Sequence, residues 1–554
     1  MRKILLAGLA ASMGLVVVTG LKADDKKVTF GANTLVVTRS VYMGTADLIT
    51  SGEALPLGCV GGATGATVDV PLVAGGTTPV MVPCGFASDN GEFPNLSDSH
   101  NVWNNANSDG SFGITSPIFL DNLTTTGTLL GTLAVPSNLI VTSFSSKSEL
   151  ALNLSVDGSS LTFMGYQGGQ GCGPNGALLS PTAPNLIDVS ASNTPGVCDP
   201  TNPVISTDPS NPTVPTAYYR AVAEVDSQGN ITVTPGNAYS GDNGRAAKKG
   251  GNGLYYMAGN DNSGNLTKKQ LSTTVPGVEL VNATGAELLT PLQPAPLPPN
   301  IGMIGRLLFS GDKPGKDDNF RGLTIFDDTL YVSKGSGSNG VNSVYQVGTA
   351  GVLPTGTAAQ LETVPLTFLS GFPTSGVNTF PFGMWFANAT TLYVCDEGDG
   401  VLVPGQVING QTNVADAYTL ANAGVQKWIL QNGTWVLAYV LQNGLDIGVP
   451  YSVPNYPAAL NPATGGCRNM TGQSGPAGTV TIWAITSTIS TNGDQGADPN
   501  KLVRVKDLLS ATTPPATHGN SNGQGRDGLG LFTTIEAAAA GEVLRGVALA
   551  PGSN

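Results

Sequence analysis

The sequence predicts an all-β protein folded as a single β-propeller, most simply with six four-stranded blades. Three observations predict it. First, a two-strand pattern recurs along the chain. Second, most charged residues are replaced by Gly, Asn, Thr and Ser. Third, a strand near the N-terminus completes a pattern that the C-terminus leaves unfinished. Charged residues make up 11% of the chain, against about 25% in ordinary soluble domains, while hydrophobic residues make up 40%. We therefore expect a folded, turn-rich protein with a neutral polar surface.

Each copy of the repeat has a turn with Gly or Arg, a short apolar strand, a small gap and a second strand. The two clearest copies cover residues 321–335 and 381–396, and further copies begin at residues 149, 244 and 468. Alternating apolar and polar residues predict further strands at 219–225, 343–347, 424–429, 435–440 and 501–505. Four strands in each repeat match the plan of a propeller blade.

The sixth copy is divided between the two ends of the chain. Residues 545–550 have the pattern of a first strand, and residues 33–39 have the pattern of a second strand. We expect the two to pair and close the ring. Seven blades are the alternative, if an insertion hides a degenerate blade. The best candidate for a helix is the stretch from Ile535 to Ala540.

Residues 1–23 have the features of a secretory signal peptide. Arg2 and Lys3 precede an apolar stretch, and small residues follow it up to Ala23. The stretch is shorter than the ~20 residues that a spanning helix needs, although a membrane anchor is the alternative. We expect an exported protein, secreted or at the cell surface, with no membrane span in the mature chain. The propeller domain then covers residues 24–554.

Three long insertions interrupt the repeats, at about residues 43–109, 167–215 and 292–299. Long loops on a rigid scaffold often carry function, but these loops can also be decoration that disulfides tie down. The chain has six cysteines, an even number that favours disulfides over a metal site in an exported protein. Proximity along the sequence suggests the pairs Cys59–Cys84, Cys172–Cys198 and Cys395–Cys467.

Four of the predicted first strands begin at an arginine, and three of these arginines follow an acid by three residues. The arginines are Arg245, Arg321, Arg468 and Arg545, and the acids are Asp242, Asp318 and Glu542. Since the first strand of a blade is innermost, the arginines would ring one mouth of the central channel. They could bind a carboxylate or phosphate, or form ion pairs that lock neighbouring blades. The repeated acids favour ion pairs, because they already match the charge.

Acidic loops recur along the chain, and the densest group is Asp396, Glu397 and Asp399. Closely spaced carboxylates suit calcium, which takes about six to eight oxygen ligands, but such clusters are also ordinary turn residues. The chain has only two histidines and no nucleophile motif, so a Ser-His-Asp site is not predicted. Acid–base chemistry by carboxylates alone stays open, for example at Asp317 or Glu149.

Three segments resemble secreted six-bladed propellers of the broad NHL and lactonase-like group. They are the Arg-Gly-Leu of residues 321–323, the Thr-Leu-Tyr-Val of residues 329–332 and the Arg-Gly-Val-Ala of residues 545–548. The resemblance covers nearly all of the mature chain as architecture. It implies a calcium ion held in the channel by Glu, Asn and Asp of the inner strands, where this chain carries mostly Arg.

The net charge of −13 argues against nucleic acid, whose phosphates need a basic face. The low charge, the scarcity of histidine and the absence of a nucleophile motif favour a non-catalytic propeller. We expect it to self-associate, or to bind another extracellular protein or a polysaccharide, since exposed outer strand edges are available for pairing. The alternative is a calcium-dependent hydrolase or lyase, lactonase- or phosphoesterase-like, that acts at the channel mouth.

Overall fold

The computed structural model describes residues 28–42, 115–167, 220–236, 244–259, 319–335, 340–515 and 529–553, with short gaps inside some of these ranges, and several isolated strands between them. Several residues of the sequence predictions lie outside the described part: the predicted signal peptide, most of the three insertions, Asp242, Asp317, Asp318, Cys59, Cys84, Cys172 and Cys198.

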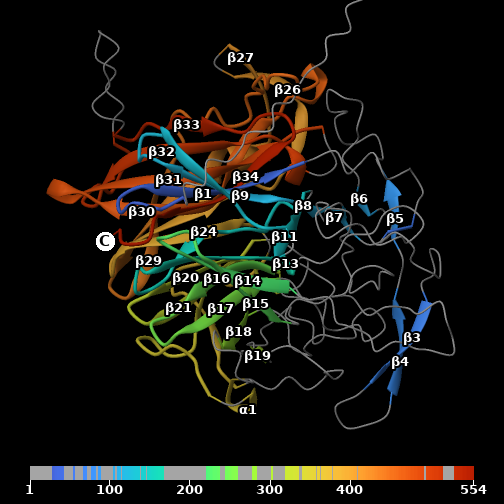
Figure 1. Cartoon of the computed structure of the whole chain (residues 1–554). Helices are drawn as coiled ribbons and strands as arrows, with labels where there is room; N and C mark the ends of the chain where they lie inside the picture. The colour runs from blue at the N-terminus through green and yellow to red at the C-terminus, as the bar shows by residue number, and fades with distance from the viewer. Residues whose placement is uncertain are drawn as a thin grey trace, which may run out of the picture.

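The fold is an all-β propeller arrangement with five blades of four antiparallel strands and almost no helix in the described part (Figure 1). Four blades are each built from one stretch of chain. We name each blade after its first strand. The β16 blade contains β16 (Gly244–Lys249), β17 (Leu254–Gly259), β18 (Val278–Asn282) and β19 (Ile301–Met303), and the β20 blade contains β20 (Phe320–Phe326), β21 (Thr329–Lys334), β22 (Ser343–Val347) and β23 (Leu366–Phe368). The β24 blade contains β24 (Pro381–Asn388), β25 (Thr391–Asp396), β28 (Gly424–Gln431) and β29 (Thr434–Leu441), and the β30 blade contains β30 (Ala463–Ser474), β31 (Thr479–Ile489), β32 (Lys501–Leu508) and β33 (Thr533–Ala537).

The fifth blade, which we call the closing blade, takes strands from both ends of the chain. Its order is β34 (Glu542–Leu549), β1 (Leu35–Val41), β9 (Ile118–Leu123) and β10 (Leu129–Ala134). Strands β1 and β34 are antiparallel, with Leu35 opposite Leu549 and Val41 opposite Glu542, and they lie side by side in Figure 1. The predicted pairing of the two chain ends is therefore confirmed.

A further sheet, the β13 sheet, departs from the four-stranded plan. It contains β8 (Thr115–Ser116), β11 (Ile140–Ser143), β12 (Asn153–Leu154), β13 (Ser160–Gln167), β14 (Arg220–Asp226) and β15 (Ile231–Gly236). Strands β11 and β12 pair with different parts of β13, so the inner strand is interrupted. The first strand predicted at 149–154 shrinks to two residues, because the chain turns at Leu150, whose φ is 63°. The predicted count of six blades is not confirmed.

The predicted helix from Ile535 to Ala540 is wrong. Its first half belongs to strand β33, which pairs with β32 and places Ala537 opposite Lys501. Alanine has the highest helix propensity, but propensity is a small effect, and pairing with an existing strand overrides it. The helices of the described chain include α1 (Ala358–Leu361) and α2 (Ala417–Asn422), and none is long and apolar enough to cross a membrane.

Six strands lie inside the insertion predicted at about residues 43–109 or at its end. Four of them form a sheet of their own, and the other two form a hairpin; the strands are β2 (Ala54–Leu55), β3 (Ala66–Pro71), β4 (Thr77–Val82), β5 (Gly85–Ser88), β6 (Asn104–Asn105) and β7 (Asp109–Gly113). This insertion is therefore not simply a loop.

The core lies largely between blades. Between the β24 and β30 blades, for example, Phe382 and Tyr393 pack with Val480 and Ile482 in one buried cluster. The Cys395–Cys467 disulfide joins the same two blades, from β25 to β30, and confirms the predicted pair. Burial between the blades and one covalent link therefore fix the β24 blade and the β30 blade against each other.

Candidate functional site

Two of the four predicted arginines are followed by glycine, because the neighbouring backbone passes very close to that position. A Cβ on Gly322 would lie 2.0 Å from the carbonyl oxygen of Phe382 in β24. A Cβ on Gly546 would lie 2.4 Å from the backbone nitrogen of Leu152, just before β12. Only glycine allows this approach. The Arg-Gly pair thus marks the contact between the inner strand of one sheet and that of the next.

Arg545 links the closing blade to the β13 sheet. Its guanidinium donates hydrogen bonds to the carbonyl oxygens of Phe144 and Ser146, in the segment between β11 and β12, and its Nε donates to Ser40 Oγ at 3.2 Å. The side chain is buried. A buried arginine needs its donors satisfied, and backbone carbonyls of the adjacent sheet satisfy them here.

Arg245 links three parts of the ring in the same way. Its Nε donates to Ser148 Oγ of the β13 sheet at 2.8 Å. Its Nη1 donates to the carbonyl oxygen of Phe320 in the β20 blade at 3.0 Å, and also to the side chain of Asn319. These contacts fit the structural alternative, in which the arginines lock neighbouring blades.

The other two arginines meet around a buried glutamate. Arg468 Nε donates to Glu397 Oε2 at 2.9 Å, and the guanidinium of Arg321 lies over the ring of Phe382, 5.7 Å from its centre. Burial alone would raise the pKa of Glu397, but the positive charges of Lys147, Arg321 and Arg468 outweigh it and lower the pKa to about 2.

We call Lys147, Arg321, Glu397 and Arg468 the axial cluster. They come from four different sheets: the β13 sheet, the β20 blade, the β24 blade and the β30 blade. Side chains from four sheets can act on one carboxylate only where the inner strands converge. The sequence predicted that the arginines would lie around one mouth of the channel, but it gave no sign that Glu397 would lie beside Arg321 and Arg468, and it missed Lys147.

Asp396 is buried beside the axial cluster and accepts four hydrogen bonds. The donors are the backbone nitrogens of Phe380 (3.2 Å) and Gly398 (2.9 Å), the hydroxyl of Tyr418 (2.7 Å) and the side-chain amide of Gln426 (3.2 Å). Burial raises its pKa to about 6 even though these donors favour the charged form. Asp396 therefore ties the start of β24 and helix α2 to the end of β25.

Asp399 points elsewhere. It accepts hydrogen bonds from the Val401 backbone nitrogen at 2.9 Å and from Thr419 Oγ1 at 3.0 Å. Burial and the nearby carboxylate of Asp416, which caps helix α2, raise the pKa of Asp399. Among the residues that the structure describes, no group of three or more His, Cys, Asp or Glu is placed to hold a metal ion. The donor set thus gives calcium no common point of coordination, and calcium at Asp396, Glu397 and Asp399 stays a prediction.

Glu542, predicted as the acid beside Arg545, accepts a hydrogen bond from Arg39 Nη1 at 2.6 Å. Arg39 also pairs with Asp121 at 2.6 Å, and Glu536 acts on it electrostatically. We call these four residues the closure cluster, since they join β1, β9, β33 and β34. The only signal for Arg39 in the sequence is a charged residue in an otherwise uncharged strand.

Glu149, named as a candidate acid or base, is buried and held by its own sheet. Its Oε2 accepts hydrogen bonds from Thr142 Oγ1 at 2.7 Å and from the Ser143 backbone nitrogen at 3.1 Å, and its Oε1 accepts from the Tyr166 hydroxyl. The described contacts of the arginines and of Glu149 are thus all compatible with a structural role, and ligand binding by the arginines stays a prediction.

Comparison with known proteins identifies no family for the chain. No family model and no curated protein matches it. Among solved structures, an ACO/RPE65 chimera aligns at 9% identity over 88% of this chain and 64% of its own, with a TM-score of 0.21. A mutant of NanB sialidase from Streptococcus pneumoniae aligns at 8% identity over 69% of this chain and 61% of its own, with a TM-score of 0.29. The chain spans less than two thirds of either protein, and similarities this weak support no inference about function.

Proposed function

We propose that this protein is a non-catalytic propeller, exported to the cell surface or beyond it, that assembles through its outer strands with further copies of itself. One observation carries the proposal: an uncharged and exposed β-hairpin stands out from the ring. The predicted signal peptide and the low charge of the chain supply the context.

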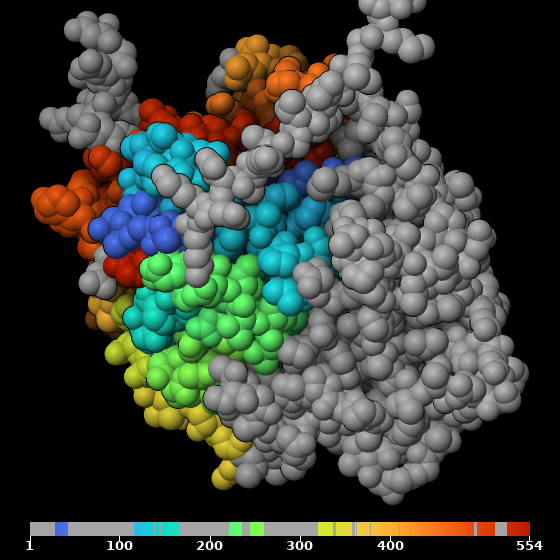
Figure 2. All heavy atoms as spheres, in the orientation of Figure 1, coloured from blue at the N-terminus to red at the C-terminus, as the bar shows by residue number. Residues whose placement is uncertain are grey.

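The hairpin consists of β26 (Leu402–Ile408) and β27 (Gln411–Ala415), which pair only with each other in the described chain. No residue from 400 to 415 is charged. Val407 is 76% exposed, and Val401 and Leu402 are exposed as well. Figure 2 shows the hairpin in orange at the top of the molecule. An exposed apolar strand with an unpaired edge is a template for pairing with another chain.

The base of the hairpin is held firmly. The side-chain amide of Asn413 donates to the carbonyl oxygen of Ile447 at 2.7 Å, and the backbone nitrogen of Val414 donates to the carbonyl oxygen of Gly448 at 2.8 Å. Pro404 interrupts the pairing near the base, so the tip around Val407 presents the regular part of the edge. A fixed base reduces the loss of conformational entropy when the tip binds.

The outer strands of two blades have the same character. Leu129 and Leu130 of β10 are exposed, and so are Val436 and Leu437 of β29. Each of these strands is the last in its sheet, so one of its edges is unpaired. Such edges offer further surfaces for contact between chains without the repulsion that a charged surface would cause.

Sedimentation velocity and electron microscopy of the purified protein test the proposal. We expect particles larger than one chain that grow with concentration, and we expect Val407→Lys to reduce them. Val352→Lys is the matched control, since Val352 is 58% exposed but lies in a turn region rather than in a strand. A strictly monomeric particle at high concentration would contradict assembly.

We also propose that the β13 sheet is the sixth blade of the ring, in line with the resemblance to NHL and lactonase-like propellers. Ala151, next to β12, forms a parallel bridge with Ala246 of β16, and its backbone nitrogen donates to the Arg245 carbonyl oxygen at 3.2 Å. On the other side, Gly546 of β34 lies against Leu152. These contacts support a sixth blade, since the sheet touches the β16 blade on one side and the closing blade on the other.

The second candidate function is a hydrolase or lyase at the axial cluster. One feature favours it: Arg468 binds the buried carboxylate of Glu397, whose pKa the nearby positive charges lower, while burial raises the pKa of the adjacent Asp396. Such a split is typical of an acid–base pair. Calcium titration by calorimetry, with activity screening on lactones, phosphate esters and polysaccharides, tests it. Absence of both binding and turnover would rule it out.

A further inference from the structure

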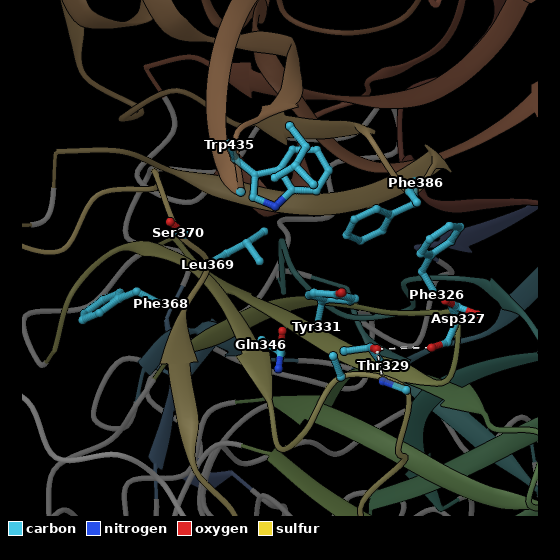
Figure 3. A pocket seen from close by; sticks show the side chains of 15 residues that line it. Phe326, Asp327, Thr329, Tyr331, Gln346, Phe368, Leu369, Ser370, Phe386 and Trp435 are labelled. Carbon is cyan, nitrogen blue, oxygen red and sulfur yellow. Dashed lines mark hydrogen bonds between the residues drawn. The ribbon is translucent and has the colours of Figure 1, made fainter.

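A groove of about 420 Å³ opens between the β20 and β24 blades, away from the axial cluster and from the hairpin. Its size lies in the range of about 300–1,000 Å³ that is usual for ligand sites. The β20 blade contributes Phe326 and Tyr331, and the β24 blade contributes Phe386 and Trp435. In Figure 3, Trp435 lies above the open centre, Tyr331 below it and Phe386 to one side. We call it the aromatic groove.

The aromatic rings form rigid walls, because they pack on one another. Phe326 and Phe386 are stacked, with ring centres 4.8 Å apart. Phe386 also meets Tyr331 at 4.7 Å, and it meets Trp435 edge-on at 5.9 Å. Rings that are held in this way keep their shape when the groove is filled, so a ligand would not have to order them.

Polar groups with spare hydrogen-bonding capacity lie among these rings. The indole N–H of Trp435 has no hydrogen-bond acceptor in the described part of the chain, whereas the indoles of Trp428 and Trp483 donate to Gln426 and Thr125. The side-chain amide nitrogen of Gln346 donates to the Gly348 carbonyl oxygen at 2.9 Å, which leaves the amide oxygen for another donor.

The groove carries little charge. Asp327, which is exposed in a hairpin turn, is the only charged residue among those that line it. A purely apolar ligand would bury the Trp435 N–H and the Gln346 amide oxygen without partners, which is unfavourable. A cationic or anionic ligand would lose its hydration without finding a buried counter-charge. The lining therefore suits a neutral ligand that has apolar faces and a polar rim.

We propose that the aromatic groove binds a neutral sugar ring of a carbohydrate chain. A pyranose has C–H groups on its faces and hydroxyl groups around its edge. One face matches the partly buried ring of Tyr331, which packs against the buried ring of Phe386. The hydroxyls match the Trp435 N–H, the Tyr331 hydroxyl and the Gln346 amide oxygen. The open side of the groove lets the rest of the chain continue into solvent.

The test starts with the purified full-length chain on an array of neutral oligosaccharides, followed by calorimetry with the oligosaccharide that binds best. We expect binding, and we expect Tyr331→Phe and Trp435→Phe each to weaken it about five- to tenfold, since each removes one hydrogen bond and keeps an aromatic ring. Trp385→Phe is the matched control, because Trp385 stacks on Tyr393 outside the groove and its replacement should leave the affinity unchanged.

Circular dichroism and the unfolding midpoint establish that each variant is folded before its affinity is compared. Absence of binding to every neutral oligosaccharide, or equal affinity of the wild type and both groove variants, would overturn the proposal. Val407→Lys should keep the full affinity for the sugar. Loss of assembly and loss of sugar binding are therefore distinguishable.

Discussion

At the scale of single residues, the buried arginines act as links between sheets rather than as exposed charges. Arg545 shows this most clearly, since its guanidinium donates to two backbone carbonyl oxygens of the adjacent β13 sheet. The loss of such a side chain leaves buried acceptors without donors and opens a cavity. Its replacement should therefore lower the free energy of unfolding, whether or not a ligand is bound.

We expect Arg545→Met to lower the free energy of unfolding by about 3 kcal/mol or more, because several buried hydrogen bonds are lost at once. Urea unfolding followed by circular dichroism measures the change. Arg504→Met in β32 is the control, since Arg504 is only half-buried and should cost less than about 1 kcal/mol. Equal effects of the two substitutions would show that Arg545 does not link the sheets.

Glu536 in the closure cluster should make stability depend on pH. Burial and the negative charges of Asp121 and Glu542 raise its pKa from 4.5 to about 7, against the opposing charge of Arg39. A raised pKa means that the folded state holds the proton more tightly. The contribution of Glu536 to the free energy of unfolding is therefore fully present below about pH 4.5 and is lost as the pH rises through 7.

Replacing Glu536 by Gln removes this dependence, because the amide resembles the protonated carboxyl. We expect Glu536→Gln to be more stable than the wild type at pH 8 by roughly 1–3 kcal/mol, and equally stable at pH 4.5. Urea unfolding at the two pH values measures the difference. A difference of the same size at both values would speak against the raised pKa.

At the scale of elements, a buried ion pair fastens the β24 blade to the β30 blade. Lys427 of β28 and Asp507 of β32 are fully buried, with Nζ and Oδ2 3.3 Å apart. The hydroxyls of Tyr393 and Tyr439 donate to Asp507 at 2.7 and 2.8 Å, and Lys427 also donates to the Ala511 carbonyl oxygen at 2.9 Å. Each charge depends on its partner, since neither is in contact with solvent.

Removal of either charge alone leaves the other buried and uncompensated. We expect Lys427→Met and Asp507→Asn each to lower the free energy of unfolding by about 3–5 kcal/mol. The double variant should lose clearly less than the sum of the two single losses, since no charge is stranded. A double-mutant cycle in urea measures the coupling. Strict additivity would show that the two residues act independently.

The strands could be predicted from the sequence because their signals are local. Alternation of apolar and polar residues predicted β22, β28 and β32, and the repeat predicted first strands beginning at Arg321 and Arg545, which lie in β20 and β34. The helix predicted at Ile535 to Ala540 failed because the deciding interaction, pairing with β32, is not local. An alanine-rich stretch does not reveal the strand that lies beside it.

The site could be predicted only in part, for a related reason. The arginines were found, but the partners of Arg545 are backbone carbonyls, which any residue carries. Lys427 and Asp507 lie in separate blades, and neither belongs to a recognisable motif. The aromatic groove combines residues from two blades that look like ordinary core residues in sequence. Spatial convergence of this kind leaves no pattern along the chain.

At the scale of the whole molecule, ring closure depends on strand β1. It pairs with β34 along its whole length on one side and with β9 on the other, and its Arg39 forms the centre of the closure cluster. The buried hydroxyl of Thr38 adds a link, since it donates to the Leu150 carbonyl oxygen at 2.8 Å. One strand therefore holds together the first and the last segments of the described chain.

We expect deletion of residues 30–42 to unfold the entire ring. The loss of β1 separates β34 from β9 and exposes the core of the closing blade. Circular dichroism, limited proteolysis and the unfolding transition measure the effect. An independent N-terminal module would instead leave the remaining blades folded, with a cooperative transition close to that of the full chain.

The divided closing blade also sets an order of events during synthesis. Strands β1, β9 and β10 leave the ribosome before the four blades that are each built from one stretch of chain, whereas β34 follows those blades. Until then, the three early strands present a bare edge that any other nascent strand can occupy. A product that stops before β34 lacks the strand that completes this sheet. Only a chain that has been translated through β34 can therefore cover the free edge of β1.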